Sequence, residues 1–121
     1  MSRALAFALL AEADILVMDQ HLPTVDALGL SPESLSERFP QLIVVAISLA
    51  GLAGEARGRR YSDLVAMAAG GIAYSTPARV PDPEQYSPLK PGGYQADYSC
   101  GLNAANAALL GLQLRRRTGK G

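Results

Sequence analysis

The chain has 121 residues, of which 49% are hydrophobic, and its 11 basic residues balance its 11 acidic ones. This hydrophobic share suffices for the core of one folded domain and argues against intrinsic disorder. The neutral balance argues against nucleic acid as a partner, because phosphate binding needs an excess of Lys and Arg. A single cysteine, Cys100, excludes an internal disulfide, and with a single histidine, His21, no metal site is expected. Acidic residues interrupt the longest apolar run, so we expect no membrane segment and a cytoplasmic domain.

The first half of the sequence alternates helix and strand patterns. Residues 3–12 contain helix formers without Gly or Pro, and residues 15–18 form a short apolar run typical of a strand buried on both faces. The triplet Ser-Pro-Glu at 31–33 predicts a helix start, and Pro40 ends that helix. Residues 42–48, rich in β-branched side chains, predict a second strand. This order predicts a parallel sheet with crossover helices, an α/β fold.

Two loops follow the predicted strands, at residues 19–21 and 48–51. In open α/β sheets, ligands bind beyond the carboxyl ends of the strands. We therefore expect a site at these loops first, although ordinary connections would look the same.

The second half is helical at both ends and irregular between. Residues 61–73 predict a helix ending at Gly70 and Gly71, and residues 74–94 are punctuated by Pro and Gly. Residues 95–115 predict one long helix, apolar almost all round, that closes with three arginines.

One face of this long helix carries small residues, namely Gly101, Ala104, Ala105, Ala108 and Gly111. Another backbone can approach such a stripe closely. Asp97 lies one turn before the stripe, at the helix end where the dipole favours a negative charge. It is either a simple first-turn carboxylate or a carboxylate held ionised as a nucleophile.

The usual catalytic fingerprints are missing. The sequence has no Gly-x-Gly-x-x-Gly, no Walker-type Gly-Lys-Ser/Thr and no Gly-x-Ser-x-Gly. His21 has no evident triad partners, and Cys100 is expected to be a small packing residue. A plain nucleotide-binding domain of the Rossmann type is therefore disfavoured.

Taken in order, several segments resemble the family III CoA-transferases, also called the CaiB/BaiF family. The resemblance rests on segments 13–17, 28–30, 40–43, 47–48, 51–54, 62–65, 70–71, 96–97 and 117–121, together with Gly101. It covers nearly the whole chain, whereas family members are several times longer. It therefore implies a partial large domain over residues 1–121: a fragment of a Rossmann-like parallel sheet with crossover helices and one long apolar C-terminal helix.

The resemblance implies an enzyme that moves CoA between carboxylic acids. Its substrates would be an acyl-CoA and a carboxylic acid, and its partner a second copy in an interlocked homodimer. The nucleophile would be Asp97, which lies four residues before a Gly as in the family motif. It would form a mixed anhydride and then an aspartyl-CoA thioester.

Further positions follow from the same resemblance. Gln20 and His21 fall in a family segment that lines the CoA site, and Arg60 falls where some members place a Lys near the cofactor. Ser62 falls where racemase members place a catalytic His. Asp63 matches an acidic residue common in the family, or is simply a solvated residue at a helix start.

Two departures leave other functions open. Leu22 replaces an aromatic residue of the family pattern, and Ala27 stands where many members have an Arg that meets a CoA phosphate. The chain could therefore be a degenerate, non-catalytic half of a larger protein, or a dimerisation or interaction module. An α-methylacyl-CoA racemase is disfavoured, because Ser62 cannot act as the catalytic His.

Overall fold

The computed structural model describes residues 3–76, 82, 84–87 and 89–121. In the described part, seven elements follow one another: α1 (Arg3–Glu12), β1 (Ile15–Met18), α2 (Leu22–Ala27), α3 (Pro32–Arg38), β2 (Ile43–Ala46), α4 (Asp63–Ala69) and α5 (Gln95–Thr118). The alternation of helices and strands that the sequence predicts is confirmed.

The two strands are parallel, as their order with intervening helices predicts. Ile15 pairs with Ile43 and Met18 with Ala46. The ladder extends past both strand ends, because Ile43 donates to the carbonyl of Asp14 and Ile47 to that of Met18. The parallel register brings the carboxyl ends of β1 and β2 to the same edge of the sheet.

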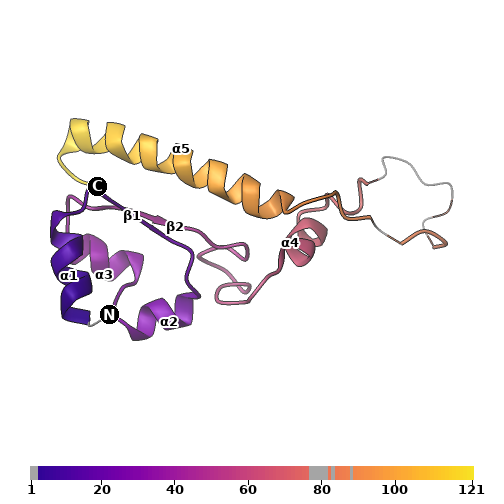
Figure 1. Ribbon diagram of the computed structural model, residues 1–121, viewed down its shortest axis with the longest axis horizontal. Coiled ribbons are helices and arrows are strands. Elements are labelled where there is room, and N and C mark those ends of the chain that lie inside the picture. Colours follow the sequence, from indigo (N-terminus) through magenta and orange to yellow (C-terminus); the bar gives the residue numbers. More distant parts are fainter. Residues whose placement is uncertain (1–2, 77–81, 83, 88) are drawn as a thin grey trace.

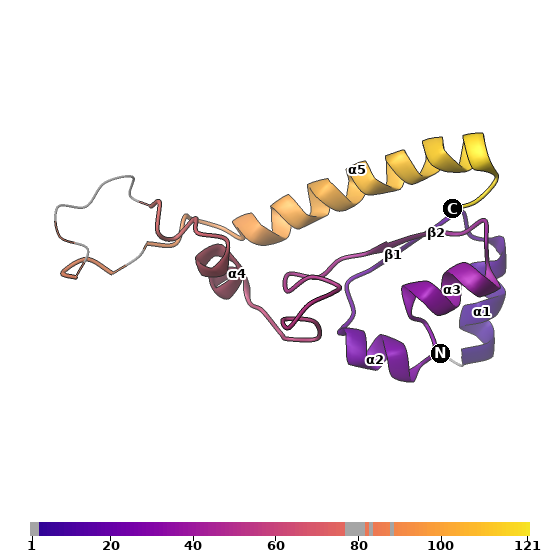
Figure 2. The same cartoon turned by 180° about the vertical axis from the view of Figure 1, so that it is seen from behind.

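The sheet lies between α5 on one face and the short helices α1, α2 and α3 on the other (Figures 1 and 2). The buried apolar side chains are Leu22, Val25, Leu35, Leu42, Ile43, Val45, Met67 and Ala73. Leu22, Val25 and Leu35 belong to α2 and α3 on one side of the sheet, whereas Ile43 of β2 faces α5 on the other. Apolar side chains are therefore buried on both sides of the sheet. A two-stranded sheet is marginal by itself, and these helices therefore stabilise it by covering both faces.

Local caps explain where the short helices begin. The Ser31 hydroxyl accepts a hydrogen bond from the Ser34 amide at 3.2 Å, and Pro32 follows at the first helical position of α3. The Ser62 hydroxyl does the same for α4, accepting from the Val65 amide at 3.4 Å. Each cap gives one backbone amide of the first helical turn a hydrogen-bond acceptor. The caps therefore fix the residues at which α3 and α4 begin.

The long helix α5 is anchored to the sheet by its C-terminal half. Gly111 lies so close to β2 that a Cβ there would come 2.6 Å from Cγ2 of Ile43. The guanidinium of Arg115 donates to Oδ1 of Asp14 at 2.7 Å and to the carbonyl of Gln41 at 3.0 Å. Gly111, the last residue of the small-residue stripe, therefore lets the sheet approach the helix closely, as the spacing predicts.

Several predicted boundaries are wrong. The helix α2 was not expected from the sequence, and its Pro23 is accommodated because it lies in the first helical turn. The second strand covers only residues 43–46 of the expected 42–48, and α4 covers 63–69 of the expected 61–73, since Ser62 caps it and Gly70 follows it. The long helix continues to Thr118.

The surface of α5 also differs from expectation. It is mixed rather than apolar all round, with Asn103, Asn106 and Gln113 exposed among its leucines, and none of its residues is fully buried. Among the described residues, no helix is long and apolar enough to cross a membrane. Of the irregular segment expected at 74–94, residues 77–81, 83 and 88 lie outside the described residues.

Candidate functional site

A hollow of about 580 Å³ opens at the carboxyl ends of the two strands. Three loop segments line it: residues 19–22 after β1, residues 47–49 after β2, and residues 58–61 before α4. The start of α5 closes it with Asp97, Cys100 and Gly101. This is the edge of the sheet that the topology indicates, and its volume is within the usual range of ligand pockets.

The segment 58–61 is held against α2. Nε2 of His21 donates to the carbonyl of Gly58 at 2.6 Å, so this nitrogen carries the proton. Arg57 and Asp26 form an ion pair at 3.0 Å. Gly58 has φ +78°, a conformation that favours glycine, and a Cβ there would be in van der Waals contact with the ring of Pro23 at 3.4 Å. These contacts place the two following arginines, Arg59 and Arg60, at the hollow.

Asp97 lies in the first turn of α5, where a carboxylate is favoured by the partial positive charge of the helix end. Cys100 and Gly101 are three and four residues later and therefore share its face. The side chain of Asp97 is exposed. The hollow thus has a carboxylate that a ligand can reach and a small residue beside it.

Charges of both signs line the hollow. Arg59 and Arg60 are exposed on one side, and Asp97 lies on the helix that closes it. Guanidinium groups bind phosphate or carboxylate oxygens with two parallel hydrogen bonds. The two guanidinium groups can therefore bind an anionic group of a ligand, while Asp19 and Asp97 add two carboxylates to the same space.

The structure brings together four of the five residues singled out in the sequence, since Asp97, Gln20, His21 and Arg60 all line the hollow. Ser62 does not line it. Its hydroxyl is engaged with the Val65 amide as the cap of α4, so its assignment to cofactor binding is not supported by its position.

Sequence reasoning missed three lining residues of the segment before α4, namely Gly58, Arg59 and Tyr61. All three lie within two residues of Arg60, and the run of three arginines at 57, 59 and 60 in four residues was the available signal. Which arginines of that run reach the hollow depends on the turn at Gly58, which spacing alone does not give.

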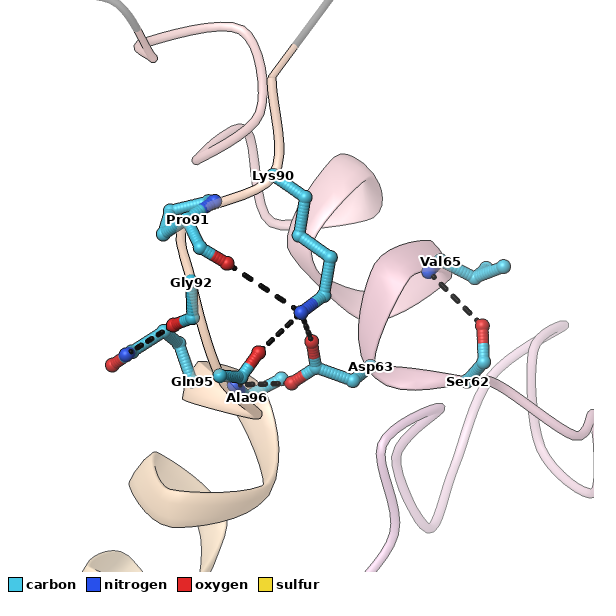
Figure 3. Close-up of polar contacts among 9 residues, drawn as sticks. Ser62, Asp63, Val65, Lys90, Pro91, Gly92, Gln95 and Ala96 are labelled. Atoms are coloured by element: carbon cyan, nitrogen blue, oxygen red, sulfur yellow. Dashed lines mark hydrogen bonds and ion pairs between the residues drawn. The ribbon is translucent and has the colours of Figure 1, made fainter.

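The possibility that Asp63 is a solvated helix-start residue is wrong. Asp63 is only 7% exposed, and its Oδ2 pairs with Nζ of Lys90 at 2.8 Å (Figure 3). Its Oδ1 accepts from the backbone amide of Ala96 at 2.8 Å. The Lys90 hydrogen bond, with the amides of Ala96 and Asp97, holds the pKa of Asp63 below its usual range, although burial acts in the opposite direction.

In the described part of the chain, no three His, Cys, Asp or Glu side chains gather where they could hold a metal ion. The side chains that line the hollow include two carboxylates, those of Asp19 and Asp97, together with two guanidinium groups, an imidazole, a phenol and a thiol.

Comparison with known proteins assigns the family. The sequence model described as CoA-transferase family III matches residues 1–121. The human succinyl-CoA:glutarate CoA-transferase is 33% identical over 113 residues, which cover 93% of this chain and 25% of that protein. The succinyl-CoA–L-malate CoA-transferase beta subunit of Chloroflexus aurantiacus is 35% identical over 114 residues, 93% of this chain and 27% of that protein. The chain thus spans about a quarter of the length of these relatives.

Solved structures agree with the sequence matches. A CaiB/BaiF family protein from Brucella suis superposes with a TM-score of 0.82 at 35% identity, over 98% of this chain and 30% of that one. A hypothetical protein from Mycobacterium tuberculosis superposes with a TM-score of 0.80 at 29% identity, over 97% of this chain and 32% of that one. Sequence and fold therefore agree that the chain belongs to the family III CoA-transferases.

Proposed function

We propose that this chain carries the nucleophile and part of the substrate site of an enzyme that transfers CoA between carboxylic acids. In this proposal residues 1–121 form part of the enzyme's large domain. The observation that carries it is the hollow, where the carboxylate of Asp97 and the cations Arg59 and Arg60 lie around one space. Family membership supports the reaction class.

In the first half-reaction, a carboxylate oxygen of Asp97 adds to the thioester carbonyl carbon of the donor acyl-CoA. The C–S bond breaks, CoA leaves as a thiolate, and an acyl-aspartyl anhydride remains. The thiolate then adds to the aspartyl carbonyl carbon, and the donor acid leaves as a carboxylate. Asp97 is now an aspartyl-CoA thioester.

The second half-reaction reverses these steps with the acceptor. The acceptor carboxylate adds to the aspartyl carbonyl carbon and releases the CoA thiolate, which then adds to the acceptor's acyl carbon. The Asp97 carboxylate leaves unchanged. Each step needs the carboxylate held in place and water kept out, because water would hydrolyse the anhydride.

The other residues at the hollow bind and orient in this proposal. Arg59 and Arg60 pair with phosphate groups of the CoA moiety, and Gln20 and His21 border the same space. Ala27 stands where many family members have an Arg and cannot bind a phosphate, so in this proposal the arginines of the segment before α4 make the phosphate contact. Both curated relatives are named for succinyl-CoA, and we propose succinyl-CoA as the donor, with glutarate and L-malate as the first acceptors to test.

Trapping of the covalent intermediate tests the proposal. The protein that carries this segment, at its full encoded length, is incubated with succinyl-CoA and then treated with hydroxylamine or borohydride. Peptide mass analysis should locate the modification on Asp97. The Asp97→Asn variant should form no adduct while keeping the fold, because the amide has the same shape but is a far poorer nucleophile. An adduct elsewhere, or one that survives in Asp97→Asn, refutes the assignment of the nucleophile.

A second function is favoured by one observation, the exposed leucines of α5. We propose that this helix is covered by a second copy of the protein in a homodimer, as the family resemblance implies. If no acyl-CoA gives transfer, a non-catalytic dimerisation half of the same fold becomes the better assignment. The cytoplasmic location inferred from composition stays a prediction.

A further inference from the structure

The helix that carries Asp97 has no cap of its own. Tyr94 occupies the N-cap position of α5, and its side chain makes no capping hydrogen bond. The first four amides of an α-helix have no partner within the helix, and a buried or packed helix start needs another acceptor for them. The start of α5 must therefore find its acceptor elsewhere in the molecule.

Asp63, the first residue of α4, supplies this acceptor. Its Oδ1 accepts from the amide of Ala96 at 2.8 Å. Ala96 is the second residue of α5, which is one of the two positions that an N-cap side chain usually contacts. A carboxylate 33 residues away in the sequence thus does the work of an N-cap for the helix (Figure 3).

Lys90 completes the arrangement from the connection before α5. Its ammonium pairs with Oδ2 of Asp63 at 2.8 Å, donates to the carbonyl of Gly93, and lies 5.5 Å from the ring centre of Tyr94. One cation therefore joins α4 to the backbone that enters α5. Its charge also balances Asp63, so that the positive end of the helix remains available to the second carboxylate, Asp97.

Asp63 itself does not line the hollow, and it is 7% exposed, so it does not contact a ligand there. Its bond partner Ala96 is the residue directly before Asp97. The position of the Asp97 backbone relative to the hollow is thus set by a contact made outside the hollow. A misplacement of about 1 Å in a reacting group can cost about 10²-fold in rate.

We propose that Asp63 is a positioning residue for Asp97, capping α5 from α4 and held in place by Lys90. The proposal rests on the proposed function, in which Asp97 is the nucleophile. The two oxygens of the carboxylate have separate roles in this proposal. Oδ1 accepts the hydrogen bond from the start of α5, whereas Oδ2 pairs with Lys90, so the negative charge of Asp63 is needed only while Lys90 is present.

Three variants of the full-length protein separate these roles. Asp63→Leu removes the acceptor for Ala96. Asp63→Asn with Lys90→Met keeps an acceptor oxygen while removing both charges. The matched control is Asp14→Asn, which breaks the ion pair with Arg115 at 2.7 Å at the other end of the same helix. The measurements are kcat and KM with succinyl-CoA, the single-turnover rate of adduct formation on Asp97, and amide hydrogen exchange at Ala96 and Asp97.

We expect Asp63→Leu to lower kcat and the adduct rate by about 10²-fold with little change in KM, because substrate binding does not involve Asp63. The double variant should recover most of this loss, whereas Asp14→Asn should retain the wild-type kcat. Amide exchange at Ala96 and Asp97 should be faster in Asp63→Leu and near normal in the double variant.

An adduct rate in Asp63→Leu equal to that of Asp14→Asn overturns the proposal. So does a double variant that is as slow as Asp63→Leu, since the retained acceptor would then have no effect. If the wild-type protein transfers no CoA, the proposed function fails, and amide exchange alone decides whether Asp63 holds the start of α5. Unchanged exchange in Asp63→Leu refutes the cap independently of activity.

Discussion

Asp63 is a buried carboxylate whose charge is stabilised by its neighbours. The hydrogen bond from Lys90, followed by the amides of Ala96 and Asp97, lowers its pKa from the ordinary value of 3.8, against the effect of burial. A carboxylate with a lowered pKa in the folded state binds fewer protons there than in the unfolded state. Its contribution to stability is therefore complete above pH 3.8 and is lost as the pH falls through the lowered folded value.

The lowered pKa of Asp63 predicts how the stability of the protein changes in acid. We expect the free energy of unfolding to fall below about pH 4 in the wild-type protein and to fall less steeply in Asp63→Asn, which has no such proton to bind. Urea unfolding at a series of pH values measures the slope. Asp26→Asn serves as control, because its ion pair with Arg57 is solvent-exposed and contributes little. An equal slope in Asp63→Asn and the wild type would contradict the expectation.

The thiol of Cys100 can report whether a ligand occupies the hollow. It is the single cysteine of these 121 residues, it is partly buried, and it lines the hollow three residues after Asp97. A ligand in the hollow should therefore shield its thiol from iodoacetamide. We expect desulfo-CoA, which has no thiol of its own, to slow alkylation about tenfold at ten times its Kd. The full-length protein is used, and mass analysis follows the labelled peptide.

A matched variant makes the alkylation measurement specific. Arg60→Ala removes a cation at the hollow without touching the thiol, so alkylation without ligand should stay at the wild-type rate while protection by desulfo-CoA weakens. Equal protection in the two proteins would show that Arg60 does not hold the ligand. No protection of the wild type would place CoA binding elsewhere.

At the level of single helices, two glycines of α5 differ in how much space surrounds them. A Cβ on Gly111 would come 2.6 Å from Cγ2 of Ile43, whereas nothing lies within 4 Å of one on Gly101. The same substitution should therefore have opposite effects on one helix. Gly111→Ala forces β2 and α5 apart, which costs about 1–3 kcal/mol, partly offset by about 0.5–1 kcal/mol of helix propensity.

Gly101→Ala should gain that propensity and raise the free energy of unfolding by about 0.5–1 kcal/mol, since its Cβ meets nothing. Denaturant unfolding of both variants beside the wild type gives the two signs. Stabilisation by Gly111→Ala would mean that the close approach of α5 to Ile43 is relieved by a small shift of the side chain and does not fix the spacing of the layers.

The elements differ in how far the sequence determines them. The start of α3 was predictable because Ser31 and Pro32 are local signals, and the parallel sheet followed from the order of elements. The helix α2 was missed because its Pro23 is compatible with either a loop or a first helical turn. Local chemistry predicts caps and stops well, whereas it cannot decide between two states that both tolerate a proline.

The candidate site also contains some residues that the sequence predicts and others that it does not. Strand order predicted that the loops after β1 and β2 would border one space, and both line the hollow. Family resemblance supplied the remaining candidates, of which Ser62 lies outside the hollow. The role of Asp63 could not be predicted, because it depends on a meeting of residues 63, 90 and 96 that only the folded chain brings together.

At the scale of the whole molecule, α5 leaves apolar surface exposed. Leu102 is 70% exposed, Leu109 61%, Leu110 70% and Leu114 54%, and no residue of the helix is fully buried. These leucines lie among the exposed amides of Asn103, Asn106 and Gln113. Several large apolar side chains exposed on one helix are typical of a surface that another protein covers. The other face of the same helix already packs on β2 through Gly111.

We therefore expect the 121-residue chain to self-associate through α5. Sedimentation at increasing concentration should show dimers or larger species, and Leu109→Gln with Leu110→Gln should shift the distribution toward the monomer, because the polar amides remove the driving force for burial. Leu9→Gln on α1, where the side chain is 57% exposed, is the matched control and should leave the distribution unchanged. A wild-type chain that stays monomeric at every concentration would contradict the homodimer proposal for this face. An equal shift in the Leu9→Gln control would instead mean that association is driven by exposed apolar surface in general, with no preference for α5.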